Sequence, residues 1–109
     1  MTDTPPLLLD SLPGLAGEVE GLLRESGRTS LADQVPGLRV HDRCRCEDEF
    51  CATVYTARPA QGSWGPRHEN VVLEPANGML VLDVVDGKVS CIEVLYRDDI
   101  REQVLKRFP

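Results

Sequence analysis

The stretch MLVLDVVDGKVSCIEVLY, residues 79–96, carries the strongest structural signal in the sequence. Two apolar runs flank Asp86-Gly87, a dipeptide preferred in two-residue β-hairpin turns of type I′. We therefore predict a hairpin in which Val85 faces Lys88. Both faces of this hairpin are largely apolar, which indicates a central position in a sheet that is covered at least partly on both sides.

The predicted register sorts the hairpin side chains onto two faces, because successive residues of a strand point to opposite sides. One face is expected to hold Leu80, Leu82, Val84, Val89, Cys91 and Leu95, with Glu93 near its end. The other is expected to hold Met79, Val81, Val85, Ile92, Val94 and Tyr96, with Asp83 and Ser90 among them. A semi-buried carboxylate in such a hairpin either signals a site or pairs with an arginine.

Further strands are predicted upstream of the hairpin. Alternation from Leu38 through Cys46, followed by FCATVYTA at residues 50–57, indicates two antiparallel strands joined across residues 46–49. VVLEP, residues 71–75, predicts another strand, which brings the sheet to about five. RPAQGSWGPRHEN, residues 58–70, is expected to form a long loop.

Helices are predicted on either side of these strands. Apolar spacing indicates a first helix over residues 14–26, and Ser30 with Asp33 is expected to cap a short second helix. Asp98 or Asp99 is expected to cap a last helix whose core stripe is Ile100, Val104, Leu105 and Phe108. Residues 1–13 are expected to be irregular. The sequence predicts a single α+β domain over residues 1–109, with two N-terminal helices, an antiparallel sheet of about five strands and a C-terminal helix.

Charge and length limit the classes of function. The chain has 109 residues and a net charge of −6, with 18 acidic and 12 basic residues. Because phosphate contacts need lysine and arginine, we expect no nucleic acid and no anionic membrane as partner, whereas a basic protein partner fits the charge. The apolar runs are too short to span a bilayer, and no secretory signal is recognisable, so a cytoplasmic protein is expected.

Two segments, LADQVPGLRVHDRCRC and VVDGKVSCIEVLYRD, resemble a group of small uncharacterised bacterial proteins. These proteins share a helical start, a cysteine-bearing strand and a hairpin of the pattern DGKhxxhEVL, where h is apolar. The resemblance covers roughly residues 18–98 and implies a bacterial cytosolic domain, but no activity. The group has the cysteine pattern C-x-C-G-C, whereas this chain has CRCEDEFC.

The cysteines of HDRCRCEDEFC, residues 41–51, admit three interpretations. Cys44, Cys46 and Cys51 form a C-x-C-x4-C pattern that could bind zinc, with Cys91 or His41 as a fourth ligand. This spacing is similar to the small zinc-binding tail of histone lysine methyltransferases, although no SET-like catalytic sequence accompanies it. Alternatively, the C-x-C pair is a redox thiol pair, or the cysteines simply pack within strands.

A non-catalytic protein-binding function is the leading prediction. Its expected interaction residues are Trp64, Arg67 and His68 in the long loop and Glu47, Asp48 and Glu49 in the acidic turn. The alternative is that Trp64 pins the loop over a sheet edge and that the acidic run is a solvated turn. No nucleophile elbow, phosphate loop, H-E-x-x-H or EF-hand pattern is present, so no enzyme is expected. An immunity or antitoxin protein is one form of this function, a structural zinc module is the first alternative and a thiol redox protein the second. No cofactor other than zinc is expected.

Overall fold

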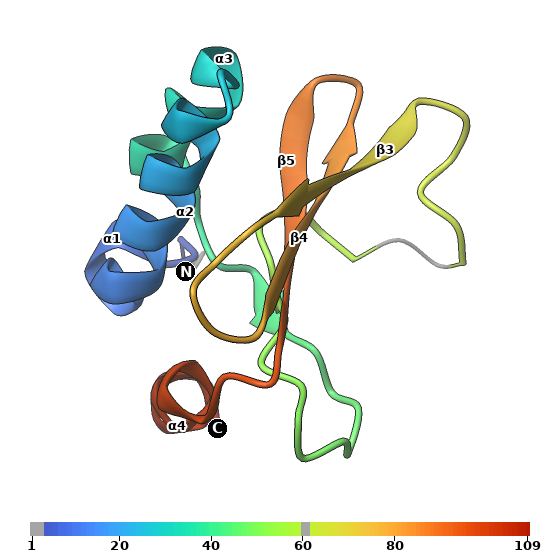
Figure 1. Cartoon of the computed structure of the whole chain (residues 1–109). Helices are drawn as coiled ribbons and strands as arrows, with labels where there is room; N and C mark the ends of the chain where they lie inside the picture. Colours follow the sequence, from blue (N-terminus) through green and yellow to red (C-terminus); the bar gives the residue numbers. More distant parts are fainter. Residues whose placement is uncertain (1–3, 60–61) are drawn as a thin grey trace.

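The computed structural model describes residues 4–59 and 62–109, and it shows an antiparallel sheet with helices at both ends of the chain (Figure 1). Five strands pair in the order β1-β2-β5-β4-β3. Their bounds are β1 Asp42–Arg43, β2 Val54–Tyr55, β3 His68–Leu73, β4 Met79–Val85 and β5 Lys88–Leu95. The helices are α1 Leu8–Ser11, α2 Pro13–Glu25, α3 Thr29–Ala32, the 3-10 helix η1 Val35–Gly37 and α4 Asp98–Arg107. The predicted α+β fold class is confirmed.

The β4–β5 hairpin forms at the centre of the sheet, as the sequence predicts. Asp86 and Gly87 have φ angles of 52° and 78°, the positive values that a type I′ turn requires at both central residues. Val85 pairs with Lys88 and Val84 with Val89, so the expected register is correct at the turn.

A β-bulge changes the register immediately beyond the turn. Asp83 pairs with Cys91 rather than with Ser90, which is therefore the extra residue of the bulge. Because one extra residue exchanges the two faces of a strand, the predicted faces are wrong from Cys91 onward. The face that packs on the helices holds Leu80, Leu82, Val84, Val89, Ile92 and Val94. The opposite face, called here the open face, holds Met79, Val81, Asp83, Cys91, Glu93 and Leu95.

The open face is more polar and less covered than the sequence suggested. Met79 is 45% exposed and Glu93 is half-buried, whereas Asp83 and Cys91 are buried. Asp83 is contacted by His68 and Asn70 of β3, and residues from both sides of β2 line the same pocket as Asp83 and Cys91.

The two strands that carry the cysteine region are shorter than predicted. β1 and β2 consist of two residue pairs, Asp42 with Tyr55 and Arg43 with Val54. Residues 44–53 form the connection between them, since Cys46 to Phe50 are exposed and have no buried face to hold them in a strand.

The third predicted strand begins earlier than expected. β3 starts at His68, which pairs with Val85, and Asn70 pairs with Asp83. The predicted loop over residues 58–70 therefore ends before His68. Residues 60–61 of that loop lie outside the described residues.

The N-terminal helices build one side of the core. α2 agrees with the predicted first helix, but α1 lies within the segment expected to be irregular. Leu8 and Leu12 are fully buried, and the Leu8 N–H donates to the Leu38 carbonyl over 2.8 Å. α3 begins at Thr29 without a side-chain cap, so the predicted cap at Ser30 is wrong.

The C-terminal helix differs from the prediction in its cap and in one core residue. The predicted caps Asp98 and Asp99 lie within the first turn of α4, and the N-cap residue Arg97 makes no side-chain cap hydrogen bond. Ile100 and Val104 are buried as expected, whereas Leu105 is 37% exposed and lies outside the core. Within residues 4–59 and 62–109, no helix is long and apolar enough to cross a bilayer.

Candidate metal centre

The connection between β1 and β2 folds back on itself and gathers cysteine side chains. The Cys44 N–H donates to the Thr53 carbonyl over 2.8 Å, which closes the base of the loop. The Cys51 N–H donates to the Asp48 carbonyl over 3.2 Å, which turns the chain at its tip. As a result, the sulfur atoms of Cys44, Cys46 and Cys51 all lie within 4.8 Å of one another. We call these residues the three-thiol group.

The loop supplies hydrogen-bond donors to two of the three thiols. The Asp48 backbone N–H donates to Cys46, and both the backbone N–H and the hydroxyl of Thr53 donate to Cys51. Hydrogen bonds to a sulfur favour its ionised form, and such outer contacts orient and tune metal ligands.

These donors divide the thiols into one that ionises readily and one that does not. The Asp48 hydrogen bond lowers the pKa of Cys46, but hydrogen bonds with Cys44 and Cys51 outweigh it and raise that pKa to about 11. Burial raises the pKa of Cys51, but the bonds from Thr53 and from the other two thiols bring it below its ordinary value. Cys51 therefore ionises more readily than Cys46.

The size of the three-thiol group fits a zinc ion. A tetrahedral Zn²⁺ with Zn–S bonds of about 2.3 Å separates its sulfur ligands by about 3.8 Å. The sulfur atoms, within 4.8 Å of one another, need to close by about 1 Å at most. Cys44 and Cys51 are half-buried and Cys46 is exposed, so an ion can reach the group from solvent.

The structure does not bring the predicted fourth ligands into this group. His41 is exposed and lies outside it, and so does Cys91, which is buried on β5. Burial, followed by the negative charges of Asp83 and Glu93, raises the pKa of Cys91 far above its ordinary value. Cys91 is therefore a buried, protonated thiol on β5, and its place outside the three-thiol group is what excludes it as a predicted ligand.

A pocket of about 300 Å³ adjoins the three-thiol group on the open face. It combines thiols, aromatic rings and carboxyl groups, and none of its described lining residues is a lysine or an arginine. Its lining residues are Cys44, Asp48, Phe50, Cys51, Thr53, Tyr55, Trp64, Asp83, Cys91, Glu93 and Leu95.

Some of the predicted interaction residues line this pocket and others do not. Trp64 and Asp48 line it, although they come from different loops, and the Trp64 ring centroid lies 6.4 Å from those of Tyr55 and His68. Arg67 is instead an exposed partner of Asp86, at 3.0 Å.

The two remaining acids of the predicted turn lie away from the pocket. Glu47 and Glu49 are exposed and do not line it.

Behind the pocket, Asp83 is the centre of a polar cluster that the sequence did not predict. Its Oδ1 atom lies 2.7 Å from His68 Nε2 and accepts a hydrogen bond from Asn70 Nδ2 over 2.8 Å. A hydrogen bond between Glu93 and Asp83, together with burial and the charge of Asp83, raises the pKa of Glu93 to about 7. The partners of Asp83 are thus not the expected arginine. The sequence HENVV could have revealed the cluster. His68 and Asn70 are two residues apart, so a strand places both on the same face.

Comparison with protein-family models, with curated proteins and with solved structures finds no match to the chain. Fold and site together define a small α+β protein with a candidate metal centre at one end of its sheet. Its function must be inferred from that centre and its surroundings.

Proposed function

We propose that this protein binds zinc through the thiolates of Cys44, Cys46 and Cys51. The observation that carries the proposal is the convergence of their three sulfur atoms within 4.8 Å of one another, in a loop whose backbone bonds hold it closed. Thiolates favour zinc among the common divalent ions, and the spacing agrees with tetrahedral zinc–sulfur geometry.

Three protein ligands would leave one tetrahedral position for water or for a ligand from outside the chain. Structural zinc sites are generally closed by four protein ligands, whereas sites with three keep an exchangeable position. This favours a zinc-binding role with an accessible ion over a purely structural zinc module. Binding would release protons, because at least Cys46 is a thiol at neutral pH and must ionise to bind the ion.

The test is a zinc competition titration against a chromophoric chelator, under reducing conditions. Wild-type protein should bind one zinc per chain, and Cys46→Ser and Cys51→Ser should each weaken binding by about tenfold or more. Cys91→Ser is the matched control and should bind as tightly as wild type. Equal loss in all variants, or no binding in wild type, would overturn the proposal.

The same proteins separate zinc binding from the thiol redox alternative. Bound zinc should protect three cysteines from alkylation, and chelator should restore their reactivity. A redox pair would instead form a reversible disulfide between Cys44 and Cys46 without any metal. Detection of that disulfide in zinc-free protein, with no zinc binding, would favour the alternative.

A second candidate function is the non-catalytic protein binding that the sequence suggests, of the immunity or antitoxin class. The pocket favours it, because Trp64 and Asp48 meet there beside Asp83 and Glu93 with no basic side chain in the lining. The discriminating variants are Trp64→Ala and the zinc-free triple serine variant of the three-thiol group. A co-purifying basic protein that is lost with Trp64→Ala and kept by the triple variant would support this function.

A further inference from the structure

The outer edge of β3 presents unpaired backbone groups. β3 has β4 as its neighbour on one side and, in the described part of the chain, no strand on the other. The Asp86 N–H donates to the Arg67 carbonyl over 3.1 Å, which identifies Arg67 and Asp86 as a hydrogen-bonded pair. Because such pairs alternate along antiparallel strands, the N–H and C=O groups of Asn70 and Val72 point outward, away from β4.

Within the described residues, β3 shows none of three common features that protect a free strand, namely a proline, a lysine or a bulge. Edge strands are commonly blunted by proline, by lysine, by a bulge or by a covering segment. β3, with the sequence HENVVL, contains neither proline nor lysine, and its six residue pairs with β4 run without a bulge. The Val72 side chain is 68% exposed.

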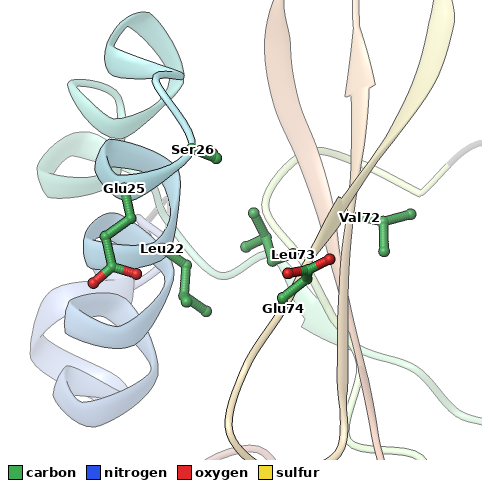
Figure 2. A pocket seen from close by; sticks show the side chains of 6 residues that line it. All are labelled: Leu22, Glu25, Ser26, Val72, Leu73 and Glu74. Carbon is green, nitrogen blue, oxygen red and sulfur yellow. The ribbon is translucent and has the colours of Figure 1, made fainter.

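A groove follows the same edge beneath the helices. One cavity of about 380 Å³ is lined by Leu22, Glu25 and Ser26 at the end of α2 and by residues 72–74. Figure 2 shows Leu22 and Leu73 extending toward one another across this space, while Val72 points to the other side of the strand.

A second cavity lies at the other end of β3. It has a volume of about 410 Å³, shares Ser26 with the first and is lined by Glu69 together with residues 26–31, Val84 and Gly87. The two cavities therefore adjoin β3 near both of its ends, and together they are called the groove.

The charge of the groove selects the kind of segment that could enter it. Glu25, Glu69 and Glu74 line it, against one base, Arg28. A second copy would bring its own Glu69 and Glu74, whereas its nearby Arg67 is already paired with Asp86, and like charges on paired strands repel. Charge complementarity thus favours a basic segment over self-association.

We propose that the β3 edge binds an extended segment of a basic partner protein as an additional strand. Its backbone would pair with the outward groups of Asn70 and Val72. Apolar residues at its centre would lie against Leu22 and Val72, and a lysine or arginine near each end would face Glu69 and Glu74. This surface is separate from the three-thiol group, since β3 and β1 form opposite edges of the sheet.

The probe is a short synthetic peptide with a central run of valine and threonine and a lysine at each end, added to zinc-loaded protein. Amide hydrogen exchange followed by NMR should show new protection at Asn70 and Val72, which otherwise exchange freely. The same peptide with glutamate in place of both lysines should give no protection. Protection confined to the β1–β2 loop, or none at all, would overturn the proposal.

Charge variants test whether the binding is specific to the groove. Glu69→Gln with Glu74→Gln should weaken the lysine peptide by about fivefold, the sum of two exposed ion pairs. The matched control, Glu49→Gln with Glu102→Gln, removes the same charge from exposed positions outside the groove and should bind like wild type. Equal weakening in both variants would show that the peptide responds only to net charge, which contradicts the proposal. A dimer that forms through β3 in analytical sedimentation would contradict it as well.

Discussion

At the scale of single residues, the open face brings together ionisable groups that shift each other's pKa. Asp83 accepts hydrogen bonds from its β3 neighbours and faces Glu93 and Cys91 from the adjacent strand. A hydrogen bond with Asp83, together with burial, raises the pKa of Glu93 to about 7, and burial raises the pKa of Cys91 as well. A protonated Glu93 can donate to Asp83, which leaves the charge of the pair at −1.

Glu93 should make the stability of the fold depend on pH. Its pKa is higher in the folded chain than the ordinary 4.5, so its contribution is fully present below pH 4.5 and is lost as the pH rises through about 7. Glu93→Gln keeps a neutral donor toward Asp83. Relative to wild type, the variant should therefore gain about 1 kcal/mol between these pH values, after allowance for solvent screening.

Urea unfolding of both proteins across that pH range measures this difference. The comparison matters because Asp83, His68 and Cys91 lie beside Glu93 and are common to both proteins. A difference that stays constant with pH would show that Glu93 is ionised throughout.

Gly78 is required by the backbone at the start of β4. Its φ angle is 69°, and a Cβ atom there would lie 2.6 Å from the Leu95 carbonyl oxygen. Gly78→Ala should therefore cost about 2 kcal/mol or more in the free energy of unfolding. Gly17→Ala is the matched control, because Gly17 lies exposed within α2 with open space around it, and it should gain about 0.5–1 kcal/mol. Urea unfolding distinguishes the two, and a neutral Gly78→Ala would contradict the account.

At this scale, the bulge residue Ser90 marks the limit of what could be predicted from the sequence. The turn residues Asp86 and Gly87 were predictable because local sequence dictates their backbone. The bulge at Ser90 was not predicted, and it places Cys91 in the pocket instead of on the expected core face. A face assigned by alternation is valid only up to the first bulge.

At the scale of elements, α1 shows that a short helix can be essential to the core. It has four residues, yet Leu8 is fully buried, while the adjacent Leu9 is 46% exposed. Leu8→Ala should destabilise the fold by about 2–5 kcal/mol, through lost burial and the cavity that remains. Leu9→Ala should change the stability by no more than about 0.5 kcal/mol. Thermal and urea unfolding of the two variants provide the measurement, and similar losses in both would show that α1 is not anchored as described.

The long helices and strands were predicted from the sequence more accurately than the short ones. The β4–β5 hairpin and α2 have long periodic patterns, and both were predicted nearly to the residue. β1 and β2 were predicted as full strands because the alternation continues through the cysteines. In the structure, the ladder ends early and the freed residues form the loop that brings the thiols together. The spacing of the cysteines suggested a metal site, but only the loop geometry reduces the candidate ligands to three.

At the scale of the whole molecule, the core does not include the three thiols, although Ala52 of the same connection belongs to it. The buried cluster joins α1, α2, α3 and α4 to the inner face of the sheet, and the three-thiol group is outside it. The protein should therefore remain folded when zinc is removed, in contrast to small domains that unfold without their metal.

Zinc should nevertheless stabilise the folded state by mass action. At free zinc about one hundred times above its dissociation constant, the gain is about 2.7 kcal/mol, or roughly 10 °C in Tm. Cys91→Ser should show the same gain, because its thiol does not bind the ion. Cys51→Ser, with binding at least about tenfold weaker, should show no more than about half of this gain. Thermal unfolding with zinc and with chelator measures this gain, and an equal response of Cys51→Ser would exclude the three-thiol group as the binding site.

X-ray absorption at the zinc edge, on protein loaded with one equivalent of zinc, tests the central claim most directly because it counts the sulfur ligands. The predicted first shell contains three sulfur atoms at about 2.3 Å and one lighter atom from water or another ligand. A shell of four sulfur atoms would contradict the exclusion of Cys91. A shell of nitrogen and oxygen alone would contradict the metal centre itself.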